Sequence, residues 1–367
     1  MKRNAAKSDR AQSPKTPPER WFVKELPGET PPSLSTMEHL YDLTSQVYGL
    51  RPWQWLAEDQ LILARDPATG ELCYCSVMGA LGEVFSVHAY IGTEGYRMFR
   101  KIQAEELAGA GEFFGSMRSV SVEFVAKTDT DALDRKLLAA FHHPTGKEIA
   151  SPIFRSIRPG FYPWFVNEQE AQTLAVCMHA TLRICTAVMS QRGLSFWDDA
   201  DTFPLVAPVE GEHPSRIQSI KAILPAEPPV AAVRSDDERF LALRHQDYAV
   251  RGVLELDHIY TPTIVGKKNE RKACICITLA VDADSGFVYS PEMTHANISP
   301  GEAMAKAFLK AVQASRTMPK EVRVRSGRLK DSVAPLLESF GITIRVAKQL
   351  PALEQAQAAL LRMMEGG

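Results

Sequence analysis

The chain lacks several features that would identify a class of protein. No apolar run approaches the roughly 20 residues that a membrane span needs, and residues 1–20 contain no apolar segment after their basic residues. A net charge of -2 argues against a protein whose whole surface coats nucleic acid. We therefore expect a cytoplasmic protein that has no membrane partner.

Motifs of common enzyme classes are missing as well. Gly79 and Gly82 are not followed by a G-K-[ST] sequence, so this stretch predicts a hairpin and not a phosphate-binding loop. No G-x-S-x-G sequence indicates a serine hydrolase. These absences leave the activity open, and the order of the predicted elements becomes the main source of information.

The cysteines allow two interpretations. None of the six belongs to a C-x-x-C pair, but C-x-C occurs twice, at Cys73 and Cys75 and again at Cys274 and Cys276. Side chains two residues apart on a strand share a face, so each pair offers two thiolates to one zinc ion. Buried thiols acting as small apolar side chains are the other interpretation. We favour the second, and expect no bound metal.

Length and composition predict more than one domain. A chain of 367 residues with 45% apolar and 23% charged residues exceeds what one hydrophobic core usually supports. Residues 1–35 are basic and rich in proline, which predicts a disordered tail. The rest divides into an α+β domain over 36–150, an α+β region over 151–235 that ends in a proline-rich linker, and an α/β domain over 236–367.

The α+β domain is expected to begin with a helix whose N-cap is Ser35 or Thr36. Residues 66–70 read as the turn of a β-hairpin. A later helix, over roughly 130–143, is expected to have Thr128 or Thr130 as its cap.

The segment "FRSIRPGFYPWF", residues 154–165, precedes a long apolar helix that begins near Glu168. Its aromatic residues and its two arginines, Arg155 and Arg158, allow two interpretations. Aromatic and guanidinium planes together can stack on nucleobases or bind a phosphorylated ligand. Alternatively, the aromatic side chains fill a junction between domains while the arginines face water, and we favour this interpretation.

The last region has the order βββαβαβα. Strands over 251–262, 272–282 and 287–295 precede a helix with Ser299 as its N-cap, and strand, helix, strand and helix follow. Such alternation after three successive strands predicts a mixed sheet with helices on both faces.

This order and several local strings resemble the ribonuclease H-like fold in its transposase and integrase branch. "LELDH" ends the first strand at Asp257, "VDADSG" places Asp282 and Ser285 in the next turn, and Pro319 precedes the fourth strand. The resemblance covers roughly residues 250–365. It implies a site in which Asp257 and other carboxylates hold two divalent cations roughly 4 Å apart.

The implied catalytic set is incomplete in this chain. The resemblance places a second aspartate just after the fourth strand, where "VRVRSG" has Arg325 and Ser326. In the last helix, Glu354 is the candidate for a third acid. Neither an arginine nor a serine can replace a carboxylate that bridges two metal ions. We therefore favour a non-catalytic protein without a cofactor, which interacts with protein or nucleic acid through a degenerate ribonuclease H-like module.

Two further hypotheses stay open. The first is a nuclease or phosphoryl-transfer enzyme that depends on Mg²⁺ or Mn²⁺ and uses Asp257, Asp282 and Glu354. The second is nucleic acid as a partner, because residues 316–348 contain eight Lys and Arg against three Asp and Glu. The candidate contacts to nucleic acid or another anion are Arg323, Arg325, Arg328, Arg155 and Arg158.

Most of the chain is also similar to a family of bacterial two-part proteins to which no activity is assigned. The strings that carry this similarity are "RPWQWLAEDQ", "VMGALGEVFSVHAYIG", "FRSIRPGFYPW" and "LELDH". The family has an N-terminal α+β region followed by a C-terminal α/β module. It implies the architecture, and it implies no substrate.

Overall fold

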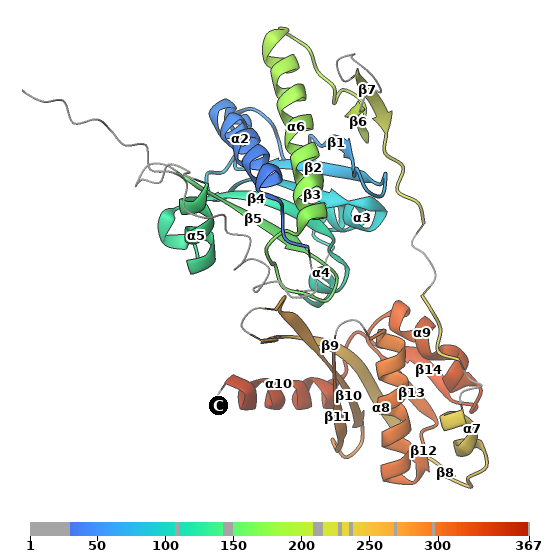
Figure 1. Cartoon of the computed structure of the whole chain (residues 1–367). Coiled ribbons are helices and arrows are strands. Elements are labelled where there is room, and N and C mark those ends of the chain that lie inside the picture. Colours follow the sequence, from blue (N-terminus) through green and yellow to red (C-terminus); the bar gives the residue numbers. More distant parts are fainter. Residues whose placement is uncertain are drawn as a thin grey trace, which may run out of the picture.

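Figure 1 shows two domains, one of which extends to strand β7 while the other begins at helix α7. The structure is a computed structural model, and much of the tail predicted for residues 1–35 lies outside its described residues. Those residues are 30–106, 110–141, 150–207, 216–226, 230–234, 238–267, 270–295 and 298–365.

The N-terminal domain is built on a seven-stranded sheet with the order β5-β4-β3-β2-β1-β6-β7. Neighbouring strands are antiparallel except β1 and β6, which are parallel. The predicted hairpin turn joins β1 to β2. The strands are β1 Ile62–Arg65, β2 Leu72–Met78, β3 Phe85–Ile91, β4 Ser119–Val125, β5 Ser151–Ile157, β6 Thr202–Ala207 and β7 Arg216–Lys221.

Helices cover both faces of this sheet. Helices α2 (Leu34–Leu50) and α6 (Glu168–Ser190) pack in one hydrophobic core with alternate residues of β2 and β3, such as Cys75 and Val87. On the other face, α3 (Gly92–Gln103) packs against Tyr74 and Tyr90. The other helices among the described residues of this domain are η1 Pro52–Gln54, α4 Ala110–Ser116, η2 Lys127–Asp129 and α5 Ala132–Ala140.

Helix α6 is long and apolar enough to cross a membrane, by length and composition alone. Half of that apolar stretch is buried inside the protein. The burial explains the composition, because α6 packs on the sheet in one hydrophobic core with α2. The long apolar helix expected from about Glu168 is thus confirmed as α6, although the sequence analysis expected no apolar run near the length of a membrane span.

The sheet corrects the boundary expected at residue 150. Strands β4 and β5 lie on either side of that residue, yet they pair along their whole length, from Ser119 with Ile157 to Val125 with Ser151. Strand β6 adds to β1 through Leu63 and Leu205. The regions 36–150 and 151–235 therefore form one domain. The boundary expected near 235 falls among residues 235–237, which lie outside the described residues.

Two predicted helix caps are also wrong. The N-cap of α2 is Ser33, whose hydroxyl accepts a hydrogen bond from the Thr36 backbone N–H at 3.2 Å. The N-cap of α5 is Asp131, which forms a reciprocal capping box with Asp134. Several Ser, Thr and Asp residues lie close together before each helix, and each of them is chemically able to cap it.

The C-terminal domain contains a five-stranded mixed sheet with the order β11-β10-β9-β13-β14. Strands β9 and β11 are antiparallel to β10, while β13 is parallel to both β9 and β14. The elements are α7 Glu238–Arg244, β8 Ala249–Val250, β9 Val253–Val265, β10 Ala273–Asp282, β11 Val288–His295, α8 Pro300–Ser315, β12 Thr317–Met318, β13 Glu321–Val324, α9 Gly327–Glu338, β14 Thr343–Val346 and α10 Pro351–Glu365.

Helices lie on both faces of this sheet, as the sequence predicts. Helices α8 and α9 pack with Leu254, Leu256 and Val322 on one face. Helix α10 contributes Leu353, which packs with Leu279 on the other face. Ser299 caps α8 as expected, with its hydroxyl 3.2 Å from the Glu302 backbone nitrogen. Helix α7 and the small β8–β12 pair are additions that were not predicted.

The aromatic segment after β5 lies at the junction of the two domains. The Tyr162 backbone N–H donates to the Lys272 carbonyl at 2.9 Å, and the Cys274 N–H donates to the Gly160 carbonyl at 3.0 Å. The rings of Phe114 and Tyr162 are stacked, with centroids 4.8 Å apart. The aromatic residues therefore contact the start of β10 at this junction, in line with the structural interpretation.

All six cysteines are buried as free thiols. Cys73 and Cys75 lie in the core under α6, and Cys276 lies inside the second sheet. Burial raises the pKa of the Cys276 thiol to about 12. The side chains are thus placed as the apolar interpretation predicts.

Candidate functional site

Asp257 lies in the middle of β9, on the face of the sheet that α10 covers. It is paired across the sheet with Leu279, which packs against α10, and only 3% of Asp257 is exposed. The pattern of "VLELDHIY" explains this position, because alternate residues of a strand point to opposite faces. Leu254 and Leu256 face α8, so Glu255 and Asp257 face α10.

Arg325 follows β13 and joins two carboxylates. Its Nε donates to Oδ2 of Asp257 at 2.8 Å, and its Nη1 donates to Oε1 of Glu354 at 3.1 Å. Glu354 belongs to the first turn of α10 and also accepts from the Leu350 N–H at 3.3 Å. The structure therefore brings together two of the three predicted acids, with a guanidinium between them.

The electrostatics of this site follow from burial and from that guanidinium. Burial raises the pKa of the Asp257 carboxyl, and the hydrogen bond and charge of Arg325 only partly oppose this effect. The pKa of Glu354 is lowered, first by the Leu350 N–H and then by Arg325. Arg325 keeps its charge, because the hydrogen bonds that it donates to both carboxylates, together with their negative charges, outweigh the effect of its own burial on its pKa.

Ser326 occupies the position where the resemblance implies a second aspartate, and its side chain has a structural role there. Its hydroxyl accepts a hydrogen bond from the Leu329 backbone N–H at 3.3 Å, and it is the N-cap of α9. The hydroxyl therefore satisfies one of the free donors at the start of that helix.

A third acid at this site, Glu255, was missed by sequence reasoning. It is 1% exposed, and its Oε2 accepts a hydrogen bond from the Leu353 N–H at 2.8 Å. A carboxylate at the first turn of a helix is favoured by the helix dipole, so Glu255 holds the start of α10 against β9. The sequence feature that could have identified Glu255 is its spacing of two residues from Asp257, because side chains two residues apart on a strand lie on the same face.

Asp282 is separated from this group. It is paired with Leu254, on the α8 side of the sheet, three residue pairs away from Asp257 along the β9–β10 ladder. Its Oδ1 accepts from the backbone N–H and the hydroxyl of Ser285, at 2.8 and 2.7 Å. Burial raises its pKa, but the bonds from Ser285 outweigh that effect and lower it. Asp282 thus shapes the turn before β11.

A metal centre is not apparent at these residues. Within the described ranges, no group of three or more His, Cys, Asp or Glu side chains has an arrangement that could hold a metal ion. At the candidate site, the Arg325 guanidinium lies between the two carboxylates that would have to converge on the ion. The donor set therefore does not fit the Mg²⁺ or Mn²⁺ pair of the catalytic hypothesis.

The arginines predicted to contact anions mostly pair with carboxylates. Arg323 donates to Glu321 at 2.8 Å, and Arg345 lies 3.2 Å from the same side chain. Arg328 lies in the exposed first turn of α9. Arg323, Arg325 and Arg345 thus each have an acidic partner.

The two arginines beside the aromatic segment are paired as well, which corrects the expectation that they face water. Arg155 binds both carboxylate oxygens of Asp134, at 2.9 and 2.6 Å, and its side chain is 15% exposed. Arg158 donates to Glu170 at 2.7 Å. Glu170 also contacts Arg271 of the C-terminal domain at 3.4 Å, so these pairs contribute to the junction.

The opposite face of the second sheet contains a buried histidine. Nδ1 of His258 lies 2.8 Å from the Thr278 hydroxyl, and its Nε2 is buried without a hydrogen-bond partner among the described residues. Burial lowers the pKa of His258 to about 4. The ring is therefore neutral at pH 7, and it lies on the other side of the sheet from Asp257.

Two family models match the chain, one in each half. Residues 38–204 match a domain of unknown function, DUF7309, and residues 242–361 match another, DUF6930. The chain thus contains two domains of unknown function, and the two matched ranges lie on either side of the linker between the sheets. Among curated proteins, none matches the sequence.

Two solved structures are weakly similar to the chain. One is the catalytic core domain of HTLV-2 integrase in complex with magnesium, in its dimeric form, with 14% identity, a TM-score of 0.25, and coverage of 31% of this chain and 70% of that chain. The trimeric form of the same domain has 15% identity and a TM-score of 0.26, with 32% and 72% covered.

Proposed function

We propose that the C-terminal domain is a degenerate ribonuclease H-like module that does not catalyse phosphoryl transfer and that binds a protein partner. The observation that carries this proposal is Arg325, which donates hydrogen bonds to both Asp257 and Glu354. The order of its sheet, in which three antiparallel strands precede two parallel ones, supports the ribonuclease H-like part.

Arg325 is incompatible with the chemistry that the resemblance implies. Two metal ions about 4 Å apart need converging carboxylates, one of which is shared between them. A guanidinium is positively charged at every physiological pH, so it repels a cation from the space that it occupies. Ser326 caps the start of α9 and provides no carboxylate at the position where the resemblance implies one, and Glu255, on the same face as Asp257, is bound to the Leu353 N–H.

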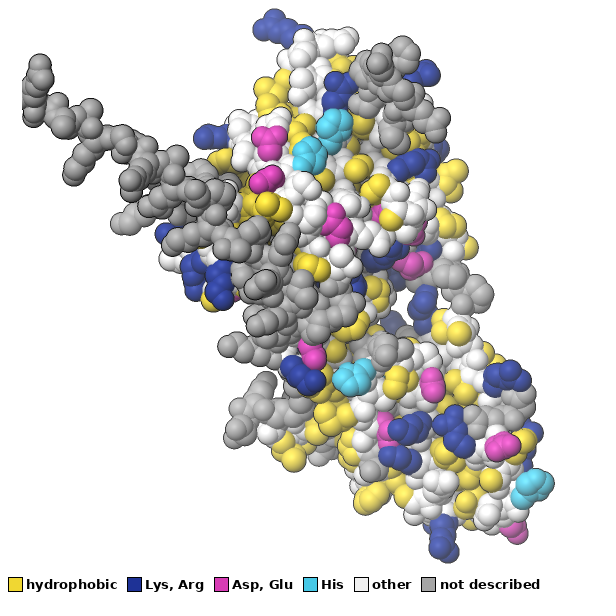
Figure 2. All heavy atoms as spheres, viewed as in Figure 1, with side chains coloured by type: hydrophobic (Ala, Val, Ile, Leu, Met, Phe, Trp, Pro, Cys, Tyr) yellow, Lys and Arg dark blue, Asp and Glu magenta, His cyan; other side chains and the backbone are white. Residues whose placement is uncertain are grey.

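A protein partner is favoured over nucleic acid by the distribution of charge. Arg323, Arg325 and Arg345 lie beside carboxylates, and binding of phosphate would have to compete with these ion pairs. Figure 2 shows Lys and Arg side chains interspersed with Asp, Glu and apolar ones over the C-terminal domain, without a uniform basic face in this view.

Both edges of the second sheet expose apolar side chains, which supports a protein partner. Met293 on the edge strand β11 is 60% exposed, and Val346 on the opposite edge strand β14 is 49% exposed. Edge strands have backbone groups that can pair with a strand of another chain. The cytoplasmic location expected from the sequence stays a prediction.

A cleavage assay tests the absence of catalysis. The full-length chain is incubated with single- and double-stranded DNA and RNA in Mg²⁺ or Mn²⁺, beside Asp257→Asn and a matched control, Asp331→Asn, on the exposed side of α9. We expect the same background in all three proteins. Cleavage that depends on the metal, is lost in Asp257→Asn and is retained in Asp331→Asn would refute the proposal.

A binding assay tests the choice of partner. Nucleic-acid affinity is measured at increasing salt, starting at about 50 mM, where contacts to phosphate are strong. We expect no binding above that of Arg345→Gln and Arg323→Gln variants. Tight binding by the unaltered chain, steeply weakened by salt and by these two substitutions, would favour nucleic acid over protein.

A further inference from the structure

The N-terminal sheet ends at β7, whose outer side pairs with no other strand of the described residues. Figure 1 shows β7 as the outermost strand of this sheet. On its inner side it pairs with β6, from Thr202 with Lys221 to Ala207 with Arg216. Its outer side is therefore a row of backbone groups to which a strand of another chain can add.

The register of the β6–β7 pair shows which backbone groups point outward. The Ala222 N–H, just after β7, donates to the Asp201 carbonyl, just before β6, at 2.8 Å. In an antiparallel pair, residues that bond to the neighbouring strand alternate with residues whose backbone groups point away from it. Because Ala222 bonds on the β6 side, the N–H and C=O groups of Ile217, Ser219 and Lys221 point outward.

The other three edges of the two large sheets are less open than β7. At β5, the backbones of Ser156 and Trp164 exchange two hydrogen bonds, at 2.7 and 2.9 Å, so a neighbouring segment already covers that strand. Strand β11 contains Pro291, which has no N–H to donate, and β14 has four residues. Strand β7 has six residues and no proline. Among these four edges, β7 is the best suited to accept a strand.

The side chains of β7 form a symmetric pattern. The strand reads RIQSIK, with a cation at each end and an isoleucine next to each cation. Ile217 is paired with Val206 in the core under α6, whereas Ile220 is paired with Phe203 in the core under α3. Alternate residues of a strand share a face. Each face of this edge therefore carries one isoleucine and one cation.

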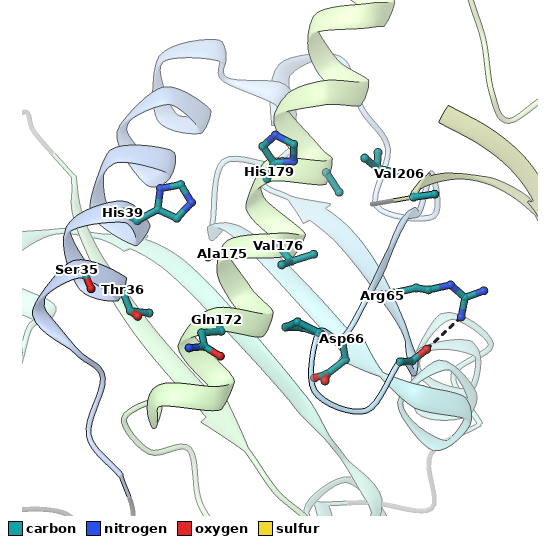
Figure 3. A pocket seen from close by; sticks show the side chains of 14 residues that line it. Ser35, Thr36, His39, Arg65, Asp66, Gln172, Ala175, Val176, His179 and Val206 are labelled. Carbon is teal, nitrogen blue, oxygen red and sulfur yellow. Dashed lines mark hydrogen bonds between the residues drawn. The ribbon is translucent and has the colours of Figure 1, made fainter. Parts of the chain in front are cut away.

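A pocket lies further in, on the α6 side of the sheet. It has a volume of about 900 Å³ and is lined by Val206 of β6, by His39 of α2 and by His179 of α6. Figure 3 shows Val206 beside α6, and the two imidazoles on α2 and α6. Strand β7 lies between the outer edge and this pocket, so His39 and His179 serve as a spatial control for binding at the edge.

The two cations of β7 are available to an incoming strand. Arg216 and Lys221 are exposed, and neither forms an ion pair with an Asp or Glu of the described ranges. Asp201, which precedes the Thr202 partner of Lys221, is itself paired with Arg100. The edge therefore presents two positive charges, one near each end of its row of outward backbone groups.

We propose that β7 binds an extended acidic segment of a partner protein, which adds to this sheet as a further strand. Opposite charges on neighbouring strands stabilise their pairing, and like charges oppose it. A second copy of β7 is therefore disfavoured, since it would bring the cations of both copies to one seam. Ile223, just after β7, is 77% exposed and offers the same segment an apolar contact. The surface uses no residue of the C-terminal domain, so it does not depend on the function proposed there.

The probes are two capped six-residue peptides, acetyl-EVTTVE-amide and acetyl-KVTTVK-amide. Each has a symmetric pattern, so it places valine beside the isoleucines of β7 and a charged residue beside its cations in either strand direction. Each peptide is titrated into the full-length protein, and the amide signals of Ile217, Ser219 and Lys221 are followed by NMR. We expect saturable shifts with the acidic peptide, and at least about fivefold weaker binding of the basic one. Salt should weaken the acidic peptide.

Two controls separate strand addition from other kinds of binding. The imidazole signals of His39 and His179 should stay unchanged, and shifts there in place of the β7 amide shifts would overturn the assignment. A six-nucleotide oligothymidylate provides negative charge without a strand, and we expect it to leave the β7 amide signals unchanged. Equal binding of the oligonucleotide and the acidic peptide at β7 would mean that the edge recognises polyanions and not an acidic strand.

Substitutions on β7 test the backbone contribution. Ser219→Pro removes an outward N–H and leaves the pairing with β6 in place, because proline is tolerated on an edge strand whose N–H faces solvent. It should weaken the acidic peptide by about fivefold or more, whereas the matched control Ser219→Thr, which keeps the N–H, should not. Self-association of the unaltered chain that Ser219→Pro abolishes, measured by sedimentation, would identify a second copy as the occupant and refute the acidic partner.

A charge reversal tests the side-chain contribution. The double substitution Arg216→Glu and Lys221→Glu should invert the preference, so that the basic peptide binds at least about fivefold more tightly than the acidic one. A role of the two cations in solubility or folding alone does not produce such an inversion. If Ser219→Pro does not fold, the charge reversal decides alone. No binding of the acidic peptide, or binding that none of these substitutions changes, would refute the proposal.

Discussion

Each sheet contains an arginine that binds a buried aspartate, and the two pairs differ in their surroundings. Arg155 of β5 forms two hydrogen bonds with Asp134 of α5, and the two side chains are 15% and 2% exposed. Arg325 forms one hydrogen bond with Asp257 and one with Glu354, and its side chain is 37% exposed.

This difference separates a purely structural pair from one that fills a candidate site. Arg155 joins a helix to the edge of a sheet, and its guanidinium also lies over the Phe165 ring, 4.8 Å from its centre. Arg325 lies at the end of a strand, next to water, between acids from β9 and α10. Because the first pair is buried, its loss should strongly lower the unfolding free energy. Loss of the second pair should have a smaller effect on the unfolding free energy and a larger one on the protonation of its carboxylates.

Arg155→Leu should have the largest effect. It leaves the Asp134 carboxylate buried without its cation, and breaking a buried pair in this way costs about 3–5 kcal/mol of unfolding free energy. Chemical denaturation measures this change. Arg192→Leu, at an exposed position after α6, is the control and should stay within about 0.5 kcal/mol of the unaltered chain. A loss under about 1 kcal/mol in Arg155→Leu would contradict the structural role.

Arg325→Leu should cost less, about 1–3 kcal/mol at pH 7, since Asp257 keeps a hydrogen bond from the His258 N–H at 2.9 Å. The pH dependence of this loss of unfolding free energy is more informative than its size. The pKa of Asp257 is already raised by burial, and loss of the opposing Arg325 charge raises it further.

When the pKa of a carboxyl group is higher in the folded than in the unfolded state, its contribution to the unfolding free energy is fully present below the ordinary aspartate pKa. This contribution is lost as the pH rises through the pKa of the folded state. The deficit of Arg325→Leu should therefore be larger at pH 7 than at pH 4, as measured by denaturation at both values. An equal deficit at the two pH values would show that Arg325 does not act on the Asp257 carboxyl.

Substitutions of Ser326 should have the smallest effects. Ser326→Ala removes the N-cap of α9 and should cost about 1 kcal/mol, whereas Ser326→Asp keeps a capping oxygen and should stay within about 0.5 kcal/mol. Thermal unfolding of both variants measures this. Equal losses would mean that the hydroxyl of Ser326 does not cap the helix.

Much of the C-terminal domain could be predicted from sequence because its signals are local. Ser299 before Pro300, the Asp282–Ser285 turn and the alternation of "VLELDH" each depend on residues close in the chain. The broken acid set was equally visible, since Arg325 and Ser326 occupy known positions after a predicted strand.

The N-terminal domain was predicted less well because its sheet depends on distant pairings. Leu63 of β1 pairs with Leu205 of β6, and no local pattern indicates such a contact. The division at residue 150 failed for that reason. The pocket between α2 and α6 was missed as well, since it forms only when His39 and His179 are brought onto facing helices.

The sequence by itself determined the mixed α/β character of the C-terminal domain, the caps and turns with a single candidate residue, and the absence of an acid after β13. Those properties follow from the spacing of apolar residues and from side chains that bind their own neighbouring backbone. Only the tertiary structure decided that Arg325 joins Asp257 to Glu354, that Asp282 lies on the other face, and that seven strands form one sheet. These facts depend on which distant segments pair, because burial of apolar surface selects among pairings that the local sequence allows equally.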